Sequence, residues 1–282
     1  MLTQEEGRLR FLRRRHESPR RRFRRGVYLL PSLFTMGHMF CGYACVVYAT
    51  RGEFETAAPF IGVAIVLDML DGRIARMTGT ASEFGVQFDS LADIITFGIA
   101  PAILAFEWAL VPLGRLGWAV GFMFLAAAAM RLARFNIQSA AGGDKRYFVG
   151  LPSPAAAAIP AATVYATAPV FPTGIHDYRS ALPVLVMVLV PAILMVSKIR
   201  FRSFKTFDLQ TRRPYTVLLL IAAAIVLVTT HPRYVLVAMA YTYLSSAFIG
   251  MAITRFKHRG GRIPALPSEL PNEQTGRDSA AG

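Results

Sequence analysis

Charged residues are scarce in this chain, and acidic ones are scarcer than basic ones. Only 17% of the 282 residues are charged, with 17 Asp and Glu against 31 Lys and Arg. A soluble domain usually carries about a quarter charged residues, so this composition argues against one. Cysteine is also rare. Cys41 and Cys45 lie one helical turn apart in an apolar run, are interpreted as packing residues and indicate no disulfide framework.

Long apolar runs take the place of charge. Hydrophobic residues make up 54% of the chain, and a membrane-spanning helix needs about 20 predominantly apolar residues. We therefore predict an all-α, polytopic bundle of about eight transmembrane helices in the cell's inner membrane. The predicted spans are residues 27–50, 55–75, 84–111, 115–136, 154–172, 181–198, 214–231 and 234–255.

Basic residues are expected mainly on one side of this bundle. Of the 31 Lys and Arg residues, only Arg51, Arg115, Arg179 and Arg233 fall on the opposite side. Cytoplasmic loops of membrane proteins carry an excess of Lys and Arg, so the basic side is predicted to be cytoplasmic. With eight spans, both termini lie on that side.

Three segments are predicted along the chain. Residues 1–26 form a basic cytoplasmic arm, 27–256 one transmembrane domain, and 257–282 a disordered cytoplasmic tail, because the tail combines Gly, Pro and polar residues without a period. The arm contains GRLRFLRRRHESPRRRFRR, which we expect to attract anionic lipid headgroups rather than nucleic acid.

Four aspartates lie inside predicted spans, within the stretch DMLDGRIARMTGTASEFGVQFDSLAD. A carboxylate near the centre of a span costs about 2.5 kcal/mol or more, so such residues are functional candidates. Asp68 and Asp71 are three residues apart and Asp89 and Asp93 are four apart, which places each pair on one helix face. Ligation by oxygen alone suits Mg²⁺ or Mn²⁺. Four carboxylates can hold two such ions, and a two-metal cluster suits phosphoryl transfer.

Other interpretations of these aspartates are a water-filled vestibule, a structural cation site and the cation pathway of a transporter. A transporter is expected to place charges near the middle of the membrane and to contain broken helices in paired halves. Here the acidic residues cluster at the cytoplasmic ends of two spans, and the two halves of the sequence do not match. His38, in TMGHMF, is interpreted as a packed polar residue of the first span.

The spacing of the aspartates resembles a known signature. Residues 68–93 match D-x₂-D-G-x₂-A-R-x₈-G-x₃-D-x₃-D without a gap, which resembles the motif of the CDP-alcohol phosphotransferases. These membrane enzymes move a phosphatidyl group from CDP-diacylglycerol to an alcohol. Further strings resemble the branch that makes phosphatidylserine: LLPSLFT, FDSLADIITFGIAPA, RLARFN and YFVGLPSPAAAA.

The resemblance implies a role for each residue of the motif. Asp68 and Asp89 bridge two divalent ions, Asp71 completes one ion's site and Asp93 the other's, and Asp93 is also the general base. Contacts to the cytidine diphosphate portion are implied for Gly72, Arg76 and Ser82, and for the segment of the first span that contains Pro31, Ser32 and Thr35. The implied products are phosphatidylserine and CMP, formed in a homodimer.

The acceptor alcohol is expected to bind beside the fourth span. Arg131 and Arg134 are three residues apart at its cytoplasmic end and are candidates for the carboxylate of L-serine, with Asn136 and Ser153 nearby. Arginines at such a position also anchor helices at the interface. Choline, glycerol 3-phosphate and an inositol phosphate are alternative acceptors, and the string GLPSPAA favours serine by resemblance alone.

Overall fold

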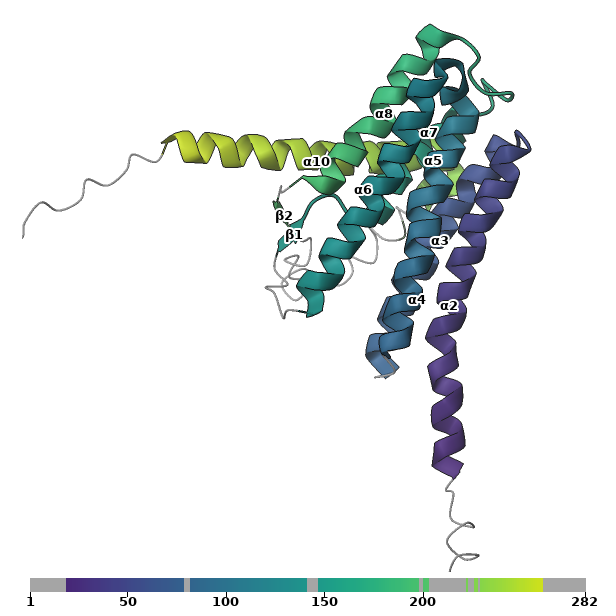
Figure 1. Cartoon of the computed structure of the whole chain (residues 1–282), viewed down its shortest axis with the longest axis vertical. Coiled ribbons are helices and arrows are strands. Elements are labelled where there is room, and N and C mark those ends of the chain that lie inside the picture. Colours follow the sequence, from purple (N-terminus) through teal and green to yellow (C-terminus); the bar gives the residue numbers. More distant parts are fainter. Residues whose placement is uncertain are drawn as a thin grey trace, which may run out of the picture.

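The computed structural model describes residues 19–78, 82–140, 147–197, 200–202, 222, 226–227 and 229–260. Most of these residues are helical, and most of the helices lie side by side along the long axis of the molecule, while α10 runs across that axis (Figure 1). This confirms the predicted class, a helical membrane protein. The longer helices are α2 (Pro19–Thr50), α3 (Phe54–Thr78), α4 (Glu83–Asp93), α6 (Arg115–Ala140), α7 (Ser153–Thr167), α8 (Tyr178–Val196) and α10 (Pro232–Gly260).

Among the described residues, four helical stretches are long and apolar enough to cross a membrane: Ser32–Thr50, Glu83–Leu113, Arg115–Gln138 and Tyr178–Val196. Each overlaps a predicted span. The predicted spans 55–75 and 154–172 are not among these four stretches. Helix α3 runs along the bundle but carries the charged residues of the motif. Helix α7 has only 15 residues, about 22 Å of helix. Most of the predicted span 214–231 lies outside the described residues, as do 1–18 and 261–282, which cover most of the predicted arm and tail.

The stretch Glu83–Leu113 is helical throughout but changes its hydrogen-bond register. After α4 come a π-helix η1 (Ile94–Ile99), α5 (Ala100–Ala105), a second π-helix η2 (Phe106–Leu110) and a 3₁₀ turn η3 (Val111–Leu113). π-helical turns are rare and occur often at functional sites. The first begins directly after Asp93 and includes Thr96, which faces α2.

Helices α2 and η1 approach closely because a glycine lies between them. A Cβ atom added to Gly42 would lie 2.7 Å from the Thr96 hydroxyl oxygen and 2.8 Å from its Cα. The Thr96 hydroxyl donates a hydrogen bond of 3.2 Å to the carbonyl of His38. Small residues allow such contacts between membrane helices, where association depends on close packing. The contact fixes the depth at which His38 lies beside the end of α4.

Among the described residues, a short antiparallel ribbon is the one sheet in a helical architecture. Strands β1 (Tyr147–Val149) and β2 (Arg200–Arg202) pair Phe148 with Phe201. Directly after β1, Gly150 adopts a φ of 85°, and the Leu151 amide donates a 3.1 Å hydrogen bond to the carbonyl of Leu194. The left-handed conformation suits glycine. This turn attaches the start of α7, and therefore Ser153, to the end of α8.

Candidate metal centre and acceptor pocket

Carboxylates from two helices converge at one end of the bundle. Asp68 and Asp71 lie near the end of α3, and Asp89 lies on α4. One ligand atom from each of these three aspartates and one from His38 all lie within 4.8 Å of one another. Asp93, at the end of α4, interacts electrostatically with all three aspartates. The structure therefore brings the four aspartates of the motif into one group.

Asp71 is the most deeply buried of the four aspartates, and it accepts a hydrogen bond from α2. Its side chain is 5% exposed, and the Thr35 hydroxyl donates a 3.1 Å hydrogen bond to its Oδ2. Asp68, Asp89 and Asp93 are partly buried. A buried carboxylate is stable only if it is paired, hydrogen-bonded or bound to a metal. One hydrogen bond to Asp71 leaves most of that requirement unmet.

The donor set fits divalent cations. Oδ1 of Asp89 and Oδ1 of Asp93 are buried and have no hydrogen-bond partner among the described residues. Neighbouring carboxylates repel one another in the absence of positive charge. Carboxylate oxygens are the ligands that Mg²⁺ and Mn²⁺ prefer. Cations between these oxygens would remove both the repulsion and the unmet hydrogen-bonding capacity.

His38 of α2 also belongs to this group, which the sequence did not indicate. Its side chain is completely buried and stacks on Phe97, as expected for a packed residue. Its Nδ1 also lies 3.5 Å from Oδ2 of Asp71, and its Nε2 lies 3.8 Å from Oδ1 of Asp93. His38 follows Thr35 by three residues, so the two share one face of α2. That spacing is the signal that could have identified it.

The residues expected to contact the cytidine diphosphate portion surround this group only in part. Gly72 is half-buried beside Asp71, and Ser32 is half-buried one turn before Thr35. The Ser82 hydroxyl accepts a 3.0 Å hydrogen bond from the Gly85 amide and so caps the first turn of α4. The side chains of Pro31 and Arg76 lie outside those that the structure describes.

Two of the residues expected to bind serine, Arg131 and Ser153, contact each other. Arg131 donates a 2.7 Å hydrogen bond from Nη1 to the hydroxyl of the buried Ser153, and it interacts electrostatically with Asp93. Its Nε is buried without a partner among the described residues. Tyr243 of α10 interacts with the same guanidinium. Arg131 thus interacts with both Asp93 and Ser153.

Arg134 and Asn136, the other two residues expected to bind serine, form hydrogen bonds to neighbouring helices. Asn136 donates a 2.9 Å hydrogen bond from Nδ2 to the Ser90 hydroxyl on α4. Arg134 donates a 3.2 Å hydrogen bond from Nη1 to the carbonyl of Val196 at the end of α8. Both contacts lie at the same end of the bundle as the carboxylates.

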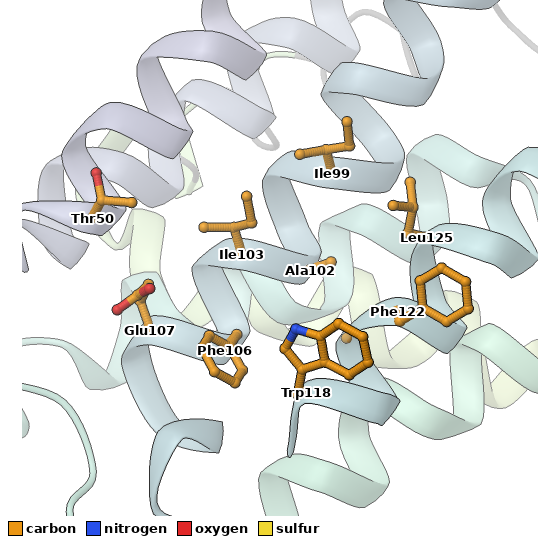
Figure 2. A pocket seen from close by; sticks show the side chains of 10 residues that line it. Thr50, Ile99, Ala102, Ile103, Phe106, Glu107, Trp118, Phe122 and Leu125 are labelled. Atoms are coloured by element: carbon orange, nitrogen blue, oxygen red, sulfur yellow. The ribbon is translucent and has the colours of Figure 1, made fainter. Parts of the chain in front are cut away.

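Two adjoining cavities lie toward the opposite end. The larger, about 410 Å³, lies between α2, the α5–η2 segment and α6, and Figure 2 shows Trp118 and Phe122 on one side of it with Thr50 and Glu107 on the other. The second, about 330 Å³, shares Thr50 and Glu107. Thr50 follows His38 by 12 residues, about 18 Å along a helix, so neither cavity is part of the carboxylate group.

The sequence profile of the CDP-alcohol phosphatidyltransferases matches residues 28–249. That match covers more than half of the chain and includes all the residues described around the carboxylates. The protein belongs to the CDP-alcohol phosphatidyltransferase family.

Curated relatives in this family carry more specific names. A CDP-diacylglycerol–serine O-phosphatidyltransferase of Helicobacter pylori (strain ATCC 700392 / 26695) is 40% identical over 179 residues, which are 64% of this chain and 74% of the relative. The enzyme of that name from Bacillus subtilis (strain 168) is 32% identical over 125 residues, 44% of this chain and 69% of the relative. An archaetidylserine synthase of Methanothermobacter thermautotrophicus is 34% identical over 174 residues, 61% of this chain and 69% of the relative.

Proposed function

We propose that this protein transfers the phosphatidyl group of CDP-diacylglycerol to the hydroxyl of L-serine, giving phosphatidylserine and CMP. The observation that carries the proposal is the convergence of Asp68, Asp71 and Asp89 at one end of the bundle. Membership of the family supports the phosphatidyl donor. The names of the relatives, which include serine in bacterial and archaeal proteins alike, support the acceptor.

The four aspartates are proposed to hold two divalent ions, Mg²⁺ or Mn²⁺. Asp68 and Asp89 would contact both ions, while Asp71 would complete the site of one ion and Asp93 that of the other. Bound divalent cations stabilise the attacking and leaving oxygens of a phosphoryl transfer. Asp71 is held for this task by the Thr35 hydroxyl. Gly72, Arg76 and Ser82, with Pro31, Ser32 and Thr35 on α2, are proposed to bind the cytidine diphosphate portion.

Asp93 is proposed to act as the general base. The hydroxyl of serine is a weak nucleophile, and a carboxylate within reach can take its proton as the new phosphoester bond forms. Arg131 interacts electrostatically with Asp93, so a substrate carboxylate bound by Arg131 would place the serine hydroxyl near this base. The proton moves to Asp93 while the oxygen attacks the phosphorus and CMP leaves in line.

The acceptor pocket is proposed to consist of Arg131 and Ser153, with Arg134 and Asn136 at its rim. Arg131 is fixed by its 2.7 Å hydrogen bond to Ser153, and its Nε donor has no partner among the described residues. A guanidinium can bind a carboxylate through two parallel hydrogen bonds. The contacts of Arg134 and Asn136 keep α8 and α4 beside this pocket.

We further propose a sequential reaction without a phosphatidyl–enzyme intermediate, because the motif at residues 68–93 contains no cysteine or histidine and its carboxylates have other roles. Incubation with CDP-diacylglycerol carrying a labelled phosphatidyl group, in the absence of serine, should leave no label bound covalently to the protein. Recovery of a labelled protein after denaturation would refute the sequential scheme.

The excess of Lys and Arg on one side of the bundle supports an orientation of the protein in the membrane. We propose an inner-membrane protein with the carboxylate end and both termini in the cytoplasm, assembled as a homodimer. Six crossings by α2, α3, the α4–η2 segment, α6, α7 and α8 return the chain to the side from which it started. A last pair formed by 214–231 and α10 would bring the total to eight without changing the side of the C-terminus.

A competition assay tests the proposed function. The purified protein would receive CDP-diacylglycerol, Mn²⁺ and an equimolar mixture of serine, choline, glycerol 3-phosphate and an inositol phosphate, and the lipids would be identified by mass spectrometry. We expect CMP release with phosphatidylserine as the dominant product, and loss of both on chelation of the metal. A different lipid would refute the acceptor, and absence of CMP would refute the transfer.

A further inference from the structure

We propose that His38 is itself a metal ligand, so that this centre binds its cation through one imidazole nitrogen as well as carboxylate oxygens. In this arrangement Nδ1 contacts the ion held by Asp68, Asp71 and Asp89, and the N–H at Nε2 points at Asp93. The inference rests on the metal centre in the proposed function but not on the identity of the acceptor alcohol.

The position of His38 is the first observation behind this proposal. Four possible ligand atoms all lie within 4.8 Å of one another: one ring nitrogen of His38 and one oxygen from each of Asp68, Asp71 and Asp89. Atoms that bind one ion at about 2.0–2.2 Å each must lie within roughly twice that distance of one another. The set therefore needs only small shifts to surround a cation.

The second observation is that the buried imidazole lacks hydrogen bonds. The side chain of His38 is 0% exposed, and neither nitrogen has a hydrogen-bond partner among the described residues. Its nearest polar atoms, at 3.5 Å on Asp71 and 3.8 Å on Asp93, lie beyond hydrogen-bonding distance. Buried polar groups are almost always satisfied, and those that are not need an explanation such as an ion. A cation beside Nδ1 supplies it.

The two nitrogens are distinguished by what each faces. Nδ1 faces Asp71, which belongs to the set of four ligands, whereas Nε2 faces Asp93, which lies next to that set. A histidine that binds a metal usually donates its other N–H to a carboxylate, which fixes the ring and makes the ligand more basic. Here that carboxylate is the proposed general base. His38 would thus link the ion to the side chain that takes the proton from serine.

Contacts with η1 hold His38 of α2 in this position. The Thr96 hydroxyl donates to the His38 carbonyl, and the ring stacks on Phe97 with centroids 6.0 Å apart. Both contacts come from η1, the π-helical turn that begins after Asp93. The position of His38 relative to the carboxylates is therefore set by the segment that directly follows the proposed base.

A nitrogen ligand changes which metals the centre prefers. Imidazole suits transition metals, whereas Mg²⁺ is bound mainly by oxygen. We therefore expect Mn²⁺ to bind more tightly than Mg²⁺, and we expect this preference to shrink when His38 is replaced. In His38→Ala, the affinity for Mn²⁺ should fall by about tenfold or more, with a smaller loss for Mg²⁺.

Pulsed electron paramagnetic resonance of the Mn²⁺-loaded protein tests the ligand directly. In nitrogen-free buffer, without nucleotide or serine, the wild type should show modulation from a coordinated ¹⁴N nucleus. Labelling histidine with ¹⁵N should replace that signal. His38→Ala and His38→Asn should abolish it, and the control His176→Ala should retain it, because His176 lines the cavity at the opposite end.

The outcomes are separable. Wild-type protein that binds Mn²⁺ without nitrogen modulation overturns the His38 proposal, whatever its activity and whether or not the variants fold. Modulation that survives in His38→Asn overturns it as well. Modulation that depends on His38 supports it even if CDP-diacylglycerol gives no phosphatidylserine, a result that would refute the proposed function alone.

Discussion

At the scale of single residues, the centre is defined by groups from separate helices that must act at one point. Asp71 illustrates this, since it lies on α3, accepts a hydrogen bond from Thr35 on α2 and shares its surroundings with Asp89 on α4. The sequence alone identifies the carboxylates because acids are rare inside apolar spans. It does not identify His38, because the contacts of that residue depend on how α2 lies against α3 and η1.

Replacing the proposed base should slow the chemical step. In Asp93→Asn, phosphatidylserine formation at saturating serine is expected to fall by about 10²- to 10⁴-fold, because the amide cannot take the serine proton. CMP release under steady-state conditions measures the effect. The matched control is Asp177→Asn, which should keep its activity. Asp177 caps the N-terminus of α8, at the end of the bundle opposite to the carboxylates. Full activity in Asp93→Asn would contradict the assignment.

The two arginines of α6 should differ in their effect on serine. Arg131→Ala is expected to raise the KM for serine by about 10- to 100-fold, since a hydrogen bond to a charged group contributes about 1.5–3 kcal/mol. The KM for CDP-diacylglycerol should change little. Arg134→Ala should have a smaller effect, because an Arg134 donor already binds the Val196 carbonyl. Equal effects of both changes on both substrates would argue against the pocket.

At the scale of elements, the sequence predicts the helices better than their internal geometry. The predicted span 84–111 corresponds to Glu83–Leu113, and 115–136 to α6. The two π-helical turns were not foreseen, because a change of hydrogen-bond register leaves the apolar pattern almost unaltered. The β1–β2 ribbon was not foreseen either, since its strands have only three residues each and are separated in the chain by two helices.

The close contact of α2 with η1 gives an element-scale prediction. Gly42→Ala should lower the stability of the folded protein by about 1–3 kcal/mol, because the new methyl group meets the backbone of Thr96 and must separate the two segments. Thermal unfolding in detergent measures this. Gly62→Ala is the control, since a Cβ there meets nothing within 4 Å. If the two variants unfold at the same temperature, the contact does not have the proposed importance.

At the scale of the whole molecule, the proposed chemistry is confined to one end. The carboxylates, Arg131 and Ser153 lie there, whereas the two cavities lie toward the other. Large apolar side chains such as Phe40, Trp118 and Phe122 are exposed, as expected for surfaces that face lipid. Helix α10 crosses the bundle axis in Figure 1, although its sequence predicts a span. In this orientation α10 packs against α7, where Tyr241 and Thr163 form a hydrogen bond of 3.0 Å.

The proposed orientation can be tested by labelling from each side. Single cysteines would be placed at Gly52 and Thr173 in a background with Cys41 and Cys45 replaced by Ala. In intact right-side-out inner-membrane vesicles, whose periplasmic face is outside, both should react with an impermeant maleimide. A cysteine at Ser279 should react only after the vesicles are opened. The reverse pattern would place the carboxylate end on the wrong side for a cytoplasmic substrate.

The central claim is that the aspartates of α3 and α4 gather divalent cations at one end of the bundle. Anomalous diffraction at the manganese edge, from crystals grown with Mn²⁺ and CDP-diacylglycerol, measures this most directly. We expect manganese peaks enclosed by Asp68, Asp71, Asp89 and Asp93, with the diphosphate on their open side. Carboxylates that point to separate surfaces, with no anomalous peak between them, would contradict it.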